Sequence, residues 1–192
     1  MERQGVTRRL AAILAADVAG YTRLMELDEE TTLEAWWRAR REVIDPDIAA
    51  HGGRIVKHTG DGFLAEFATV TEAVKCAAGM QQKLAPLAAG MAGDKRLEFR
   101  MGINLGDIVV DDEDIYGDGV NLAARIEGLA EAGGICLSAD VYNQVHKRLD
   151  CPSSKHSGLL SLFLNGGSGS SWFDVKPLVV DGSSGVFERS VF

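Results

Sequence analysis

Two aspartates stand at positions where a protein of mixed helices and strands commonly binds a metal ion. Asp17 follows the apolar run LAAILAA, at the end of a segment that we expect to be a buried strand. Asp61 lies in TGDGF, where Asp-Gly predicts the tight turn of a hairpin. Alone, each aspartate is more often structural, because this residue is common at helix N-termini and in turns. Together, the two carboxylates would form an oxygen-rich site that suits Mg²⁺ or Mn²⁺.

Further polar groups follow the first strand and occupy a later helix. The turn at 18–22, VAGYT, offers backbone amides where a helix begins, which is a common cradle for phosphate. Its candidate phosphate-binding residues are Ala19, Gly20, Tyr21 and Thr22. Asn121 and Arg125 are four residues apart in a predicted helix and therefore share one face. They form either a solvated stripe, with Arg125 paired to Glu127 or Glu131, or a pair of donors for a ribose and a phosphate.

The elements that must position these residues follow the order β-α-β-β-α-β-α-β-α. Expected strands lie at 9–18, 54–60, 63–69, 97–110 and 133–138, and expected helices at 28–50, 70–87, 120–132 and 139–149. The first six elements match the split βαβ pattern of ferredoxin-like folds. We therefore expect one α/β (α+β) sandwich, a mixed sheet with helices packed on one face and extra C-terminal α/β elements. In such a sheet the first strand lies beside the hairpin, so Asp17 and Asp61 should be neighbours.

Length and charge limit the possible functions. The chain has 192 residues, enough for one domain with a real core. Its net charge is −8, so nucleic acid and anionic membranes are poor candidates for partners, because both attract a basic face. No stretch is long and apolar enough to span a membrane, and we expect a cytoplasmic location. An acidic protein that binds a nucleotide needs a cation between the like charges, which agrees with a metal site.

Three cysteines and two adjacent tryptophans are expected to be structural. Cys76, Cys136 and Cys151 have no CxxC spacing, so we expect reduced thiols, with Cys136 in the core. Trp36 and Trp37 cannot both face the core from one helix. One should pack inside, and the other is free to contact a partner.

Three segments, in this order and at this spacing, carry a resemblance to a known family. ILAADVAGYTRLM, KHTGDGFLAEF and DIYGDGVNLAARIE resemble the catalytic domains of class III adenylate/guanylate cyclases of the bacterial type, over roughly residues 8–149. The resemblance implies a ferredoxin-like βαββαβ palm. It also implies a head-to-tail homodimer with two equivalent sites, each shared between the two chains. The reaction would convert ATP to 3′,5′-cyclic AMP and pyrophosphate, by attack of the ribose 3′-hydroxyl on the α-phosphate.

The resemblance implies a role for each matching residue of the metal and transition-state groups. Asp17, Asp61 and the carbonyl oxygen of Val18 would bind two ions of Mg²⁺ or Mn²⁺ per site. Asn121 would orient the ribose, and Arg125 would stabilise the transition state. The metal ligands would come from one chain, and the Asn-Arg pair would come from its partner together with the purine-reading residues Lys57 and Asp114.

Lys57 and Asp114 match the family's pair that reads the purine. Adenine presents an amine donor beside a ring-nitrogen acceptor, which suits a carboxylate and an ammonium group. Guanine presents a carbonyl to Asp114, so two acceptors would meet and remain unpaired. The resemblance therefore favours an adenylate cyclase. The alternatives are a guanylate cyclase, or a catalytically silent module for nucleotide binding or dimerisation.

The C-terminal part departs from the family pattern. We divide the chain into a catalytic domain at 1–149 and an atypical Gly/Ser-rich segment at 150–192, where LLSLFL is either a strand or irregular. Family members continue into closing strands with a lysine that holds the triphosphate, and neither Lys155 nor Lys176 can be aligned with it. Asp107 stands where some relatives carry a phosphate-binding arginine. Both departures bear on phosphate affinity.

Overall fold

The computed structural model describes residues 7–90, 95–111, 114–148, 159–163 and 174–178. Its strands are β1 (Thr7–Val18), β2 (Arg54–His58), β3 (Gly62–Phe67), β4 (Phe99–Asp111), β5 (Asp114–Tyr116), β6 (Ile135–Leu137), β7 (Leu159–Phe163) and β8 (Asp174–Leu178). Its helices are α1 (Tyr21–Leu27), α2 (Glu29–Ala39), the π-helical turn η1 (Arg40–Ile44), α3 (Asp45–Ala50), α4 (Val70–Ala89), α5 (Asp118–Glu127) and α6 (Ala139–Val145).

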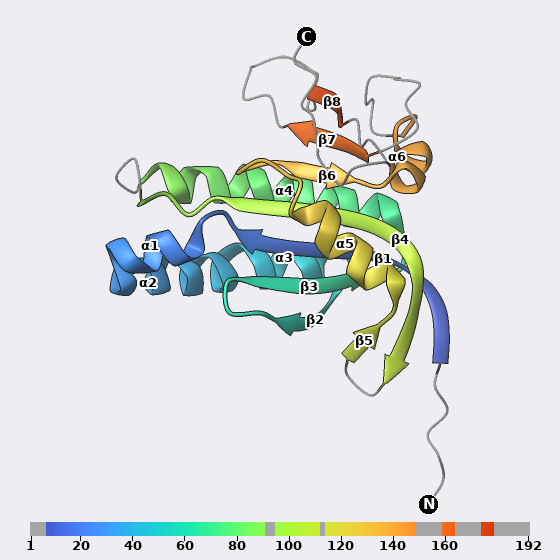
Figure 1. The fold of residues 1–192 in the computed structure, drawn as a ribbon, viewed down its shortest axis with the longest axis horizontal. Coiled ribbons are helices and arrows are strands. Elements are labelled where there is room, and N and C mark those ends of the chain that lie inside the picture. Colours follow the sequence, from blue (N-terminus) through green and yellow to red (C-terminus); the bar gives the residue numbers. More distant parts are fainter. Residues whose placement is uncertain (1–6, 91–94, 112–113, 149–158, 164–173, 179–192) are drawn as a thin grey trace, which may run out of the picture.

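The described strands form one sheet in the order β2-β3-β1-β4-β6-β7-β8, with β5 paired to the far end of β4 (Figure 1). The strands β2, β3, β1 and β4 are antiparallel to their neighbours, whereas β4 and β6 run parallel. The order β2-β3-β1-β4, with helices after β1 and β3, is that of a ferredoxin-like sheet. The predicted mixed α+β sheet is thus confirmed.

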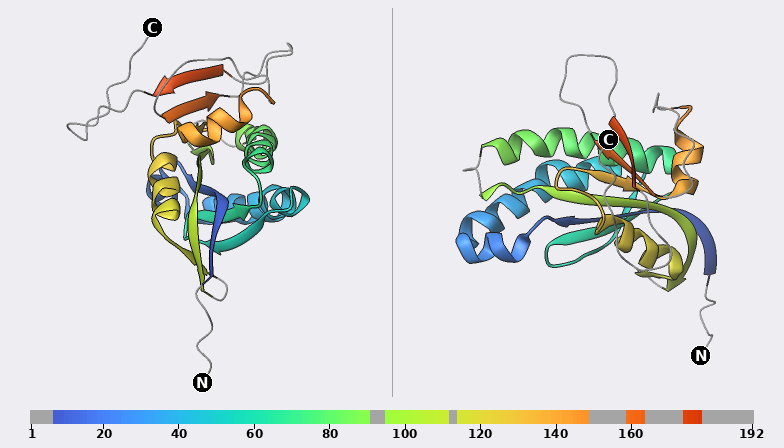
Figure 2. Two further views of the ribbon diagram at one scale, coloured as in Figure 1. Left: turned by 90° about the vertical axis from the view of Figure 1, so that its right-hand side faces the viewer. Right: turned by 45° about the horizontal axis from the view of Figure 1, so that its top comes forward.

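Strand β1 is buried on both faces, because helices cover both sides of the sheet. Ala12, Leu14 and Ala16 join the large core under α2, α3, α4 and α6. Ile13 and Ala15 point to the other side and pack in a second cluster that contains Ala123 of α5. Figure 2 shows α5 and α4 on opposite sides of the strands. The expectation that all helices lie on one face is therefore wrong, since α5 covers the other face.

Helix α5 lies directly on the backbone of β4, because glycines face each other there. A Cβ atom at Gly102 would lie 2.2 Å from the amide nitrogen of Glu127 and 2.6 Å from the carbonyl oxygen of Ala123. A Cβ atom at Gly106 would lie 2.8 Å from the Cα of Gly119. No other residue type leaves room for so close an approach of helix and strand. The distance between α5 and the sheet is therefore set by backbone contact.

The long helical segment expected at 28–50 begins with a cap and contains one widened turn. The side chain of Asp28 accepts a hydrogen bond from the Thr31 amide and so caps α2. In η1, the Asp45 amide donates to the Arg40 carbonyl, five residues back. Pro46 has no N–H to continue the α-helical ladder, which explains the local π geometry. The helical path continues through α3 to Ala50, as expected.

The C-terminal strands extend the sheet beyond the predicted domain boundary. Strand β7, within LLSLFL, pairs antiparallel with β6, and β8 pairs antiparallel with β7. For LLSLFL the alternatives were a strand and an irregular segment, and the structure shows a strand. Lys176 lies in β8 opposite Ser161, and Lys155 lies outside the described residues. The division of the chain at residue 149 stays a prediction.

The tryptophans and the described cysteines lie as expected. Trp36 is only 4 % exposed and packs on Phe99 with 5.6 Å between ring centroids, whereas Trp37 is 56 % exposed. Cys76 and Cys136 are buried and form no disulfide within the described residues, and Cys151 lies outside them. Within the ranges that the structure describes, every helix is too short or too polar to cross a lipid bilayer.

Candidate active site

Asp17 and Asp61 come together where β1 ends beside the hairpin of β2 and β3. The Val18 amide donates to the carbonyl of Asp61 over 2.9 Å, and Asp17 lies opposite Gly62 in the β1–β3 pairing. A Cβ atom at Gly62 would lie 2.1 Å from the carbonyl oxygen of Ala16, so only glycine lets the hairpin tip approach β1 this closely. The topology predicted this meeting of the two aspartates. Their role as metal ligands stays a prediction.

Two residues that the sequence analysis did not select, Arg100 and Glu127, surround the Asp17 carboxylate. Arg100 lies directly opposite Asp17 in the β1–β4 pairing. Its Nε donates to Asp17 Oδ1 over 2.9 Å, and its Nη2 donates to Asp17 Oδ2. The Nε also lies 3.5 Å from Oε1 of Glu127, at the C-terminal end of α5. The cross-strand register creates this cluster, and a register is not visible in a single strand's sequence.

Burial and neighbouring charge perturb the ionisable groups of this cluster. Burial raises the pKa of Glu127 to about 8, and the adjacent Asp17 adds to the increase. The hydrogen bonds to Asp17 raise the pKa of Arg100, so its guanidinium stays charged. Strongly perturbed groups of this kind gather at functional sites more often than elsewhere. The sequence offered Glu127 only as a partner for Arg125. In the structure Glu127 faces the sheet instead.

The oxygen atoms at the end of β1 and the hairpin tip fit a hard divalent ion, provided that the substrate and water supply its remaining ligands. Asp17, Asp61 and the Val18 carbonyl offer oxygen atoms only, which suits Mg²⁺ or Mn²⁺. In the part of the chain that the structure describes, no three acidic, histidine or cysteine side chains gather closely enough to hold a metal by themselves. Water and phosphate oxygens would have to complete the coordination, as they commonly do for Mg²⁺.

The turn after Asp17 presents part of the expected phosphate cradle. Helix α1 begins at Tyr21, and Gly20 precedes it with a φ of 68°, a conformation that favours glycine. The amide of Ala19 already donates to the carbonyl of Glu98 over 2.8 Å. Of the four residues expected to bind phosphate, only Gly20, Tyr21 and Thr22 could therefore offer their amides. Burial raises the pKa of Tyr21, and the negative charges of Asp61 and Glu29 raise it further.

Lys57 of β2 and Asp114 of β5 form a second polar centre. The ammonium group of Lys57 donates to both carboxylate oxygens of Asp114, over 3.0 and 3.1 Å. The Ile115 amide donates to the same carboxylate over 2.8 Å, and the Tyr116 ring lies 5.7 Å from the Lys57 nitrogen. The hydrogen bond from Lys57 lowers the pKa of Asp114, so this carboxylate is ionised near neutral pH. The resemblance implied that these two residues act on the same purine, and this role stays a prediction.

Asn121 and Arg125 lie on the outer side of α5, away from the metal-site candidates of the same chain. Gly119, Ala123 and Ile126 are the buried residues of α5, whereas Asn121 and Arg125 are exposed. Within the described residues, Arg125 takes part in no ion pair. One copy of the chain therefore does not bring the Asn-Arg pair to Asp17.

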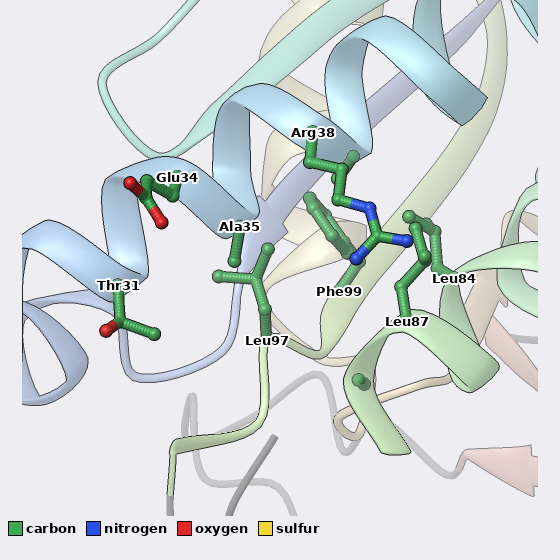
Figure 3. Close-up of a pocket in the computed structure, with 10 residues that line it drawn as sticks. Thr31, Glu34, Ala35, Arg38, Leu84, Leu87, Leu97 and Phe99 are labelled. Carbon is green, nitrogen blue, oxygen red and sulfur yellow. The ribbon is translucent and has the colours of Figure 1, made fainter. Parts of the chain in front are cut away.

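A separate pocket of about 200 Å³ lies between α2, α4 and the start of β4. Figure 3 shows its wall of Ala35, Leu84, Leu87 and Leu97, with Arg38 reaching across toward the leucines. None of the predicted site residues lines it. The candidate active site is therefore defined by the polar clusters and not by this apolar pocket.

Comparison with known proteins assigns the class of the chain. Residues 7–163 match the model of the adenylate and guanylate cyclase catalytic domain, so the chain belongs to this family. A putative adenylate cyclase 3 from Rhizobium meliloti is 48 % identical over 150 residues, which are 78 % of this chain and 26 % of that protein. The chain thus spans about a quarter of that relative.

Two solved structures support the same assignment. An adenylate/guanylate cyclase/hydrolase from Silicibacter pomeroyi is 43 % identical, with a TM-score of 0.72 over 89 % of this chain and 96 % of that one. The guanylyl cyclase Cya2 is 25 % identical, with a TM-score of 0.65 over 90 % of this chain and 91 % of that one. The resemblance expected from the three motifs is confirmed. Because both cyclase types are among these neighbours, family membership leaves the purine open.

Proposed function

We propose that this domain is an adenylate cyclase, which converts ATP to 3′,5′-cyclic AMP and pyrophosphate. The Lys57–Asp114 pair is the observation that carries the choice of purine. Its carboxylate can accept from the amine of adenine, and its ammonium group can donate to the adjacent ring nitrogen. Guanine would set its carbonyl against Asp114, and unpaired buried acceptors discriminate strongly.

The candidate metal ligands and the Asn121–Arg125 pair suit the steps of this reaction. Asp17, Asp61 and the Val18 carbonyl would hold the divalent ions, which lower the pKa of an attacking hydroxyl and offset phosphate charge when bound. Asn121 would hydrogen-bond the ribose and hold its 3′-hydroxyl in line with the α-phosphate. Arg125 would donate to the phosphate oxygens as their charge increases in the transition state.

The substrate test compares the two purines directly. The domain is incubated with Mn²⁺ and either ATP or GTP, and the cyclic nucleotide is quantified. Cyclic AMP should form at least about a hundred times faster than cyclic GMP, in keeping with recognition by polar groups that the bound purine would cover. Faster formation of cyclic GMP would refute the role of the Lys57–Asp114 pair and favour a guanylate cyclase.

We infer further that each active site takes Asn121 and Arg125 from a second copy of the chain. The outward position of these side chains on α5 supports this arrangement. Mixing inactive Asp17→Ala with inactive Arg125→Ala should then restore activity, because one of the two sites in each heterodimer is intact. Random pairing gives about a quarter of the wild-type rate. Heterodimers that form and stay inactive would contradict the shared site.

A catalytically silent nucleotide-binding or dimerisation module is the second candidate function. The unaligned sequence after residue 149, where the family's phosphate-binding lysine is expected, favours it. Binding of an ATP analogue without any cyclic nucleotide at high protein concentration would support the silent module. Cyclic AMP from the wild type, and none from Arg125→Ala, would exclude it.

A further inference from the structure

One guanidinium group lies between two carboxylates at the end of β1. Arg100 donates two hydrogen bonds to Asp17, and its Nε lies 3.5 Å from Glu127 Oε1. The side chain of Glu127 is 13 % exposed, and Oε1 is buried without a hydrogen-bond partner among the described residues. Arg100 therefore hydrogen-bonds to Asp17 and lies close to Glu127 without a hydrogen bond to it.

The unpaired oxygen of Glu127 makes a second position of Arg100 favourable. A buried carboxyl oxygen without a hydrogen-bond partner costs free energy, because it has lost water and gained no hydrogen bond in return. A guanidinium carries five N–H donors in a rigid fork, so a modest rotation of its side chain can pair it with Glu127. The close contact of α5 with Gly102 keeps Glu127 within reach.

The charges at this corner favour the same exchange. Asp17 and Asp61 supply two negative charges, and Arg100 supplies one positive charge. A divalent ion on the two aspartates therefore leaves an excess positive charge beside them, which repels the guanidinium. A metal ion bound to Asp17 also competes with the two hydrogen bonds from Arg100 for the same carboxylate oxygens. Glu127 offers the only other carboxylate among the described residues within 4 Å of Arg100.

We propose that Arg100 occupies Asp17 when the site holds no metal, and that it transfers to Glu127 when a divalent ion binds. Arg100 and Glu127 are thus positioning residues that set the affinity for metal. The inference rests on the proposed role of Asp17 as a metal ligand.

The test measures Mn²⁺ binding by electron paramagnetic resonance of the free ion, without nucleotide, on the whole chain. Arg100→Gln should bind Mn²⁺ about fivefold more tightly, since a partly exposed ion pair no longer competes. Glu127→Gln should bind it about fivefold more weakly, because the displaced arginine then lacks a carboxylate. Arg9→Gln is the matched control, because it removes one arginine from the distant Glu66 and should leave binding within about twofold.

A double-mutant cycle separates the exchange from a general effect of charge. If Arg100 moves to Glu127, the effect of Glu127→Gln disappears in the Arg100→Gln background. An equal loss of affinity in both backgrounds would refute the exchange, and so would weaker Mn²⁺ binding by Arg100→Gln. If the glutamine variant fails to fold, Arg100→Lys, which keeps the charge but not the fork, should bind Mn²⁺ about twofold more tightly than wild type, and unchanged or weaker binding would refute the exchange.

Asp17→Asn distinguishes a failure of this inference from a failure of the proposed metal site. Loss of Mn²⁺ binding in this variant, with an unchanged affinity in Arg100→Gln, would refute the exchange alone. Wild-type binding by Asp17→Asn would refute Asp17 as a ligand and with it both proposals.

Discussion

Substituting Gly102 by alanine should displace α5 from the sheet. The added methyl group would lie 2.2 Å from the Glu127 nitrogen and 2.6 Å from the Ala123 oxygen. Both atoms belong to backbone, so no side chain can rotate away, and α5 must move by roughly 1 Å to reach ordinary contact. Overpacking of this kind costs about 1–3 kcal/mol, and the rigid neighbours favour the upper end.

Urea denaturation measures this loss, with Gly79→Ala as the matched control. Gly79 lies inside α4, and among the described residues outside its own helix the atom nearest to a methyl group there would be Asp47 Oδ2, at 4.0 Å. Alanine stabilises a helix interior by about 0.5–1 kcal/mol relative to glycine, so the two substitutions should change stability in opposite directions.

Cyclase activity is a second measure of the effect of Gly102→Ala. Because α5 carries the proposed catalytic pair Asn121 and Arg125, a shift of about 1 Å should lower cyclase activity by about a hundredfold. Gly79→Ala should keep the wild-type rate. A Gly102→Ala variant with wild-type stability and activity would show that backbone contact does not set the position of α5.

Three further predictions concern the core and two titrating groups. Trp36→Ala should lower the free energy of unfolding by about 3–5 kcal/mol and Trp37→Ala by at most about 0.5 kcal/mol, as measured by urea denaturation. Burial lowers the pKa of His58 below 6.5, so its stabilising contribution is present above pH 6.5 and is lost as the pH falls through the folded-state pKa. The melting temperature of His58→Gln should therefore fall less than that of wild type between pH 7.5 and 5.5. Removing the hydrogen bond with Lys57→Met should raise the pKa of Asp114 toward its usual value in a carboxyl NMR titration, and an unchanged pKa would mean that the pair does not form in solution.

The sequence predicted the elements well but did not predict which face of the sheet each helix covers. Periodicity shows which side of a helix is buried, and it carries no information on the side of the sheet that receives it. The continuous apolar run of β1 did contain a usable signal, since a strand that is buried on both faces needs cover on both faces. That signal would have predicted at least one helix on the opposite side, without identifying α5 as that helix.

The candidate site was predictable where residues lie in local motifs and was missed where long-range pairing forms it. Asp17, Asp61 and the Lys57–Asp114 pair were found, because turn chemistry and the resemblance mark them. Arg100 was not found, because its pairing with Asp17 depends on the register of two strands 83 positions apart.

The two half-sites that we propose lie on separate elements, and this separation has an evolutionary consequence. The aspartates belong to a strand end and a hairpin tip, whereas Asn121 and Arg125 are exposed on a helix and contribute little to the core. Either half can therefore decay by mutation without unfolding the domain. After a gene duplication, each copy could lose a different half. The two products would then be active only as an obligate pair, and a symmetric enzyme would have become one that requires two genes.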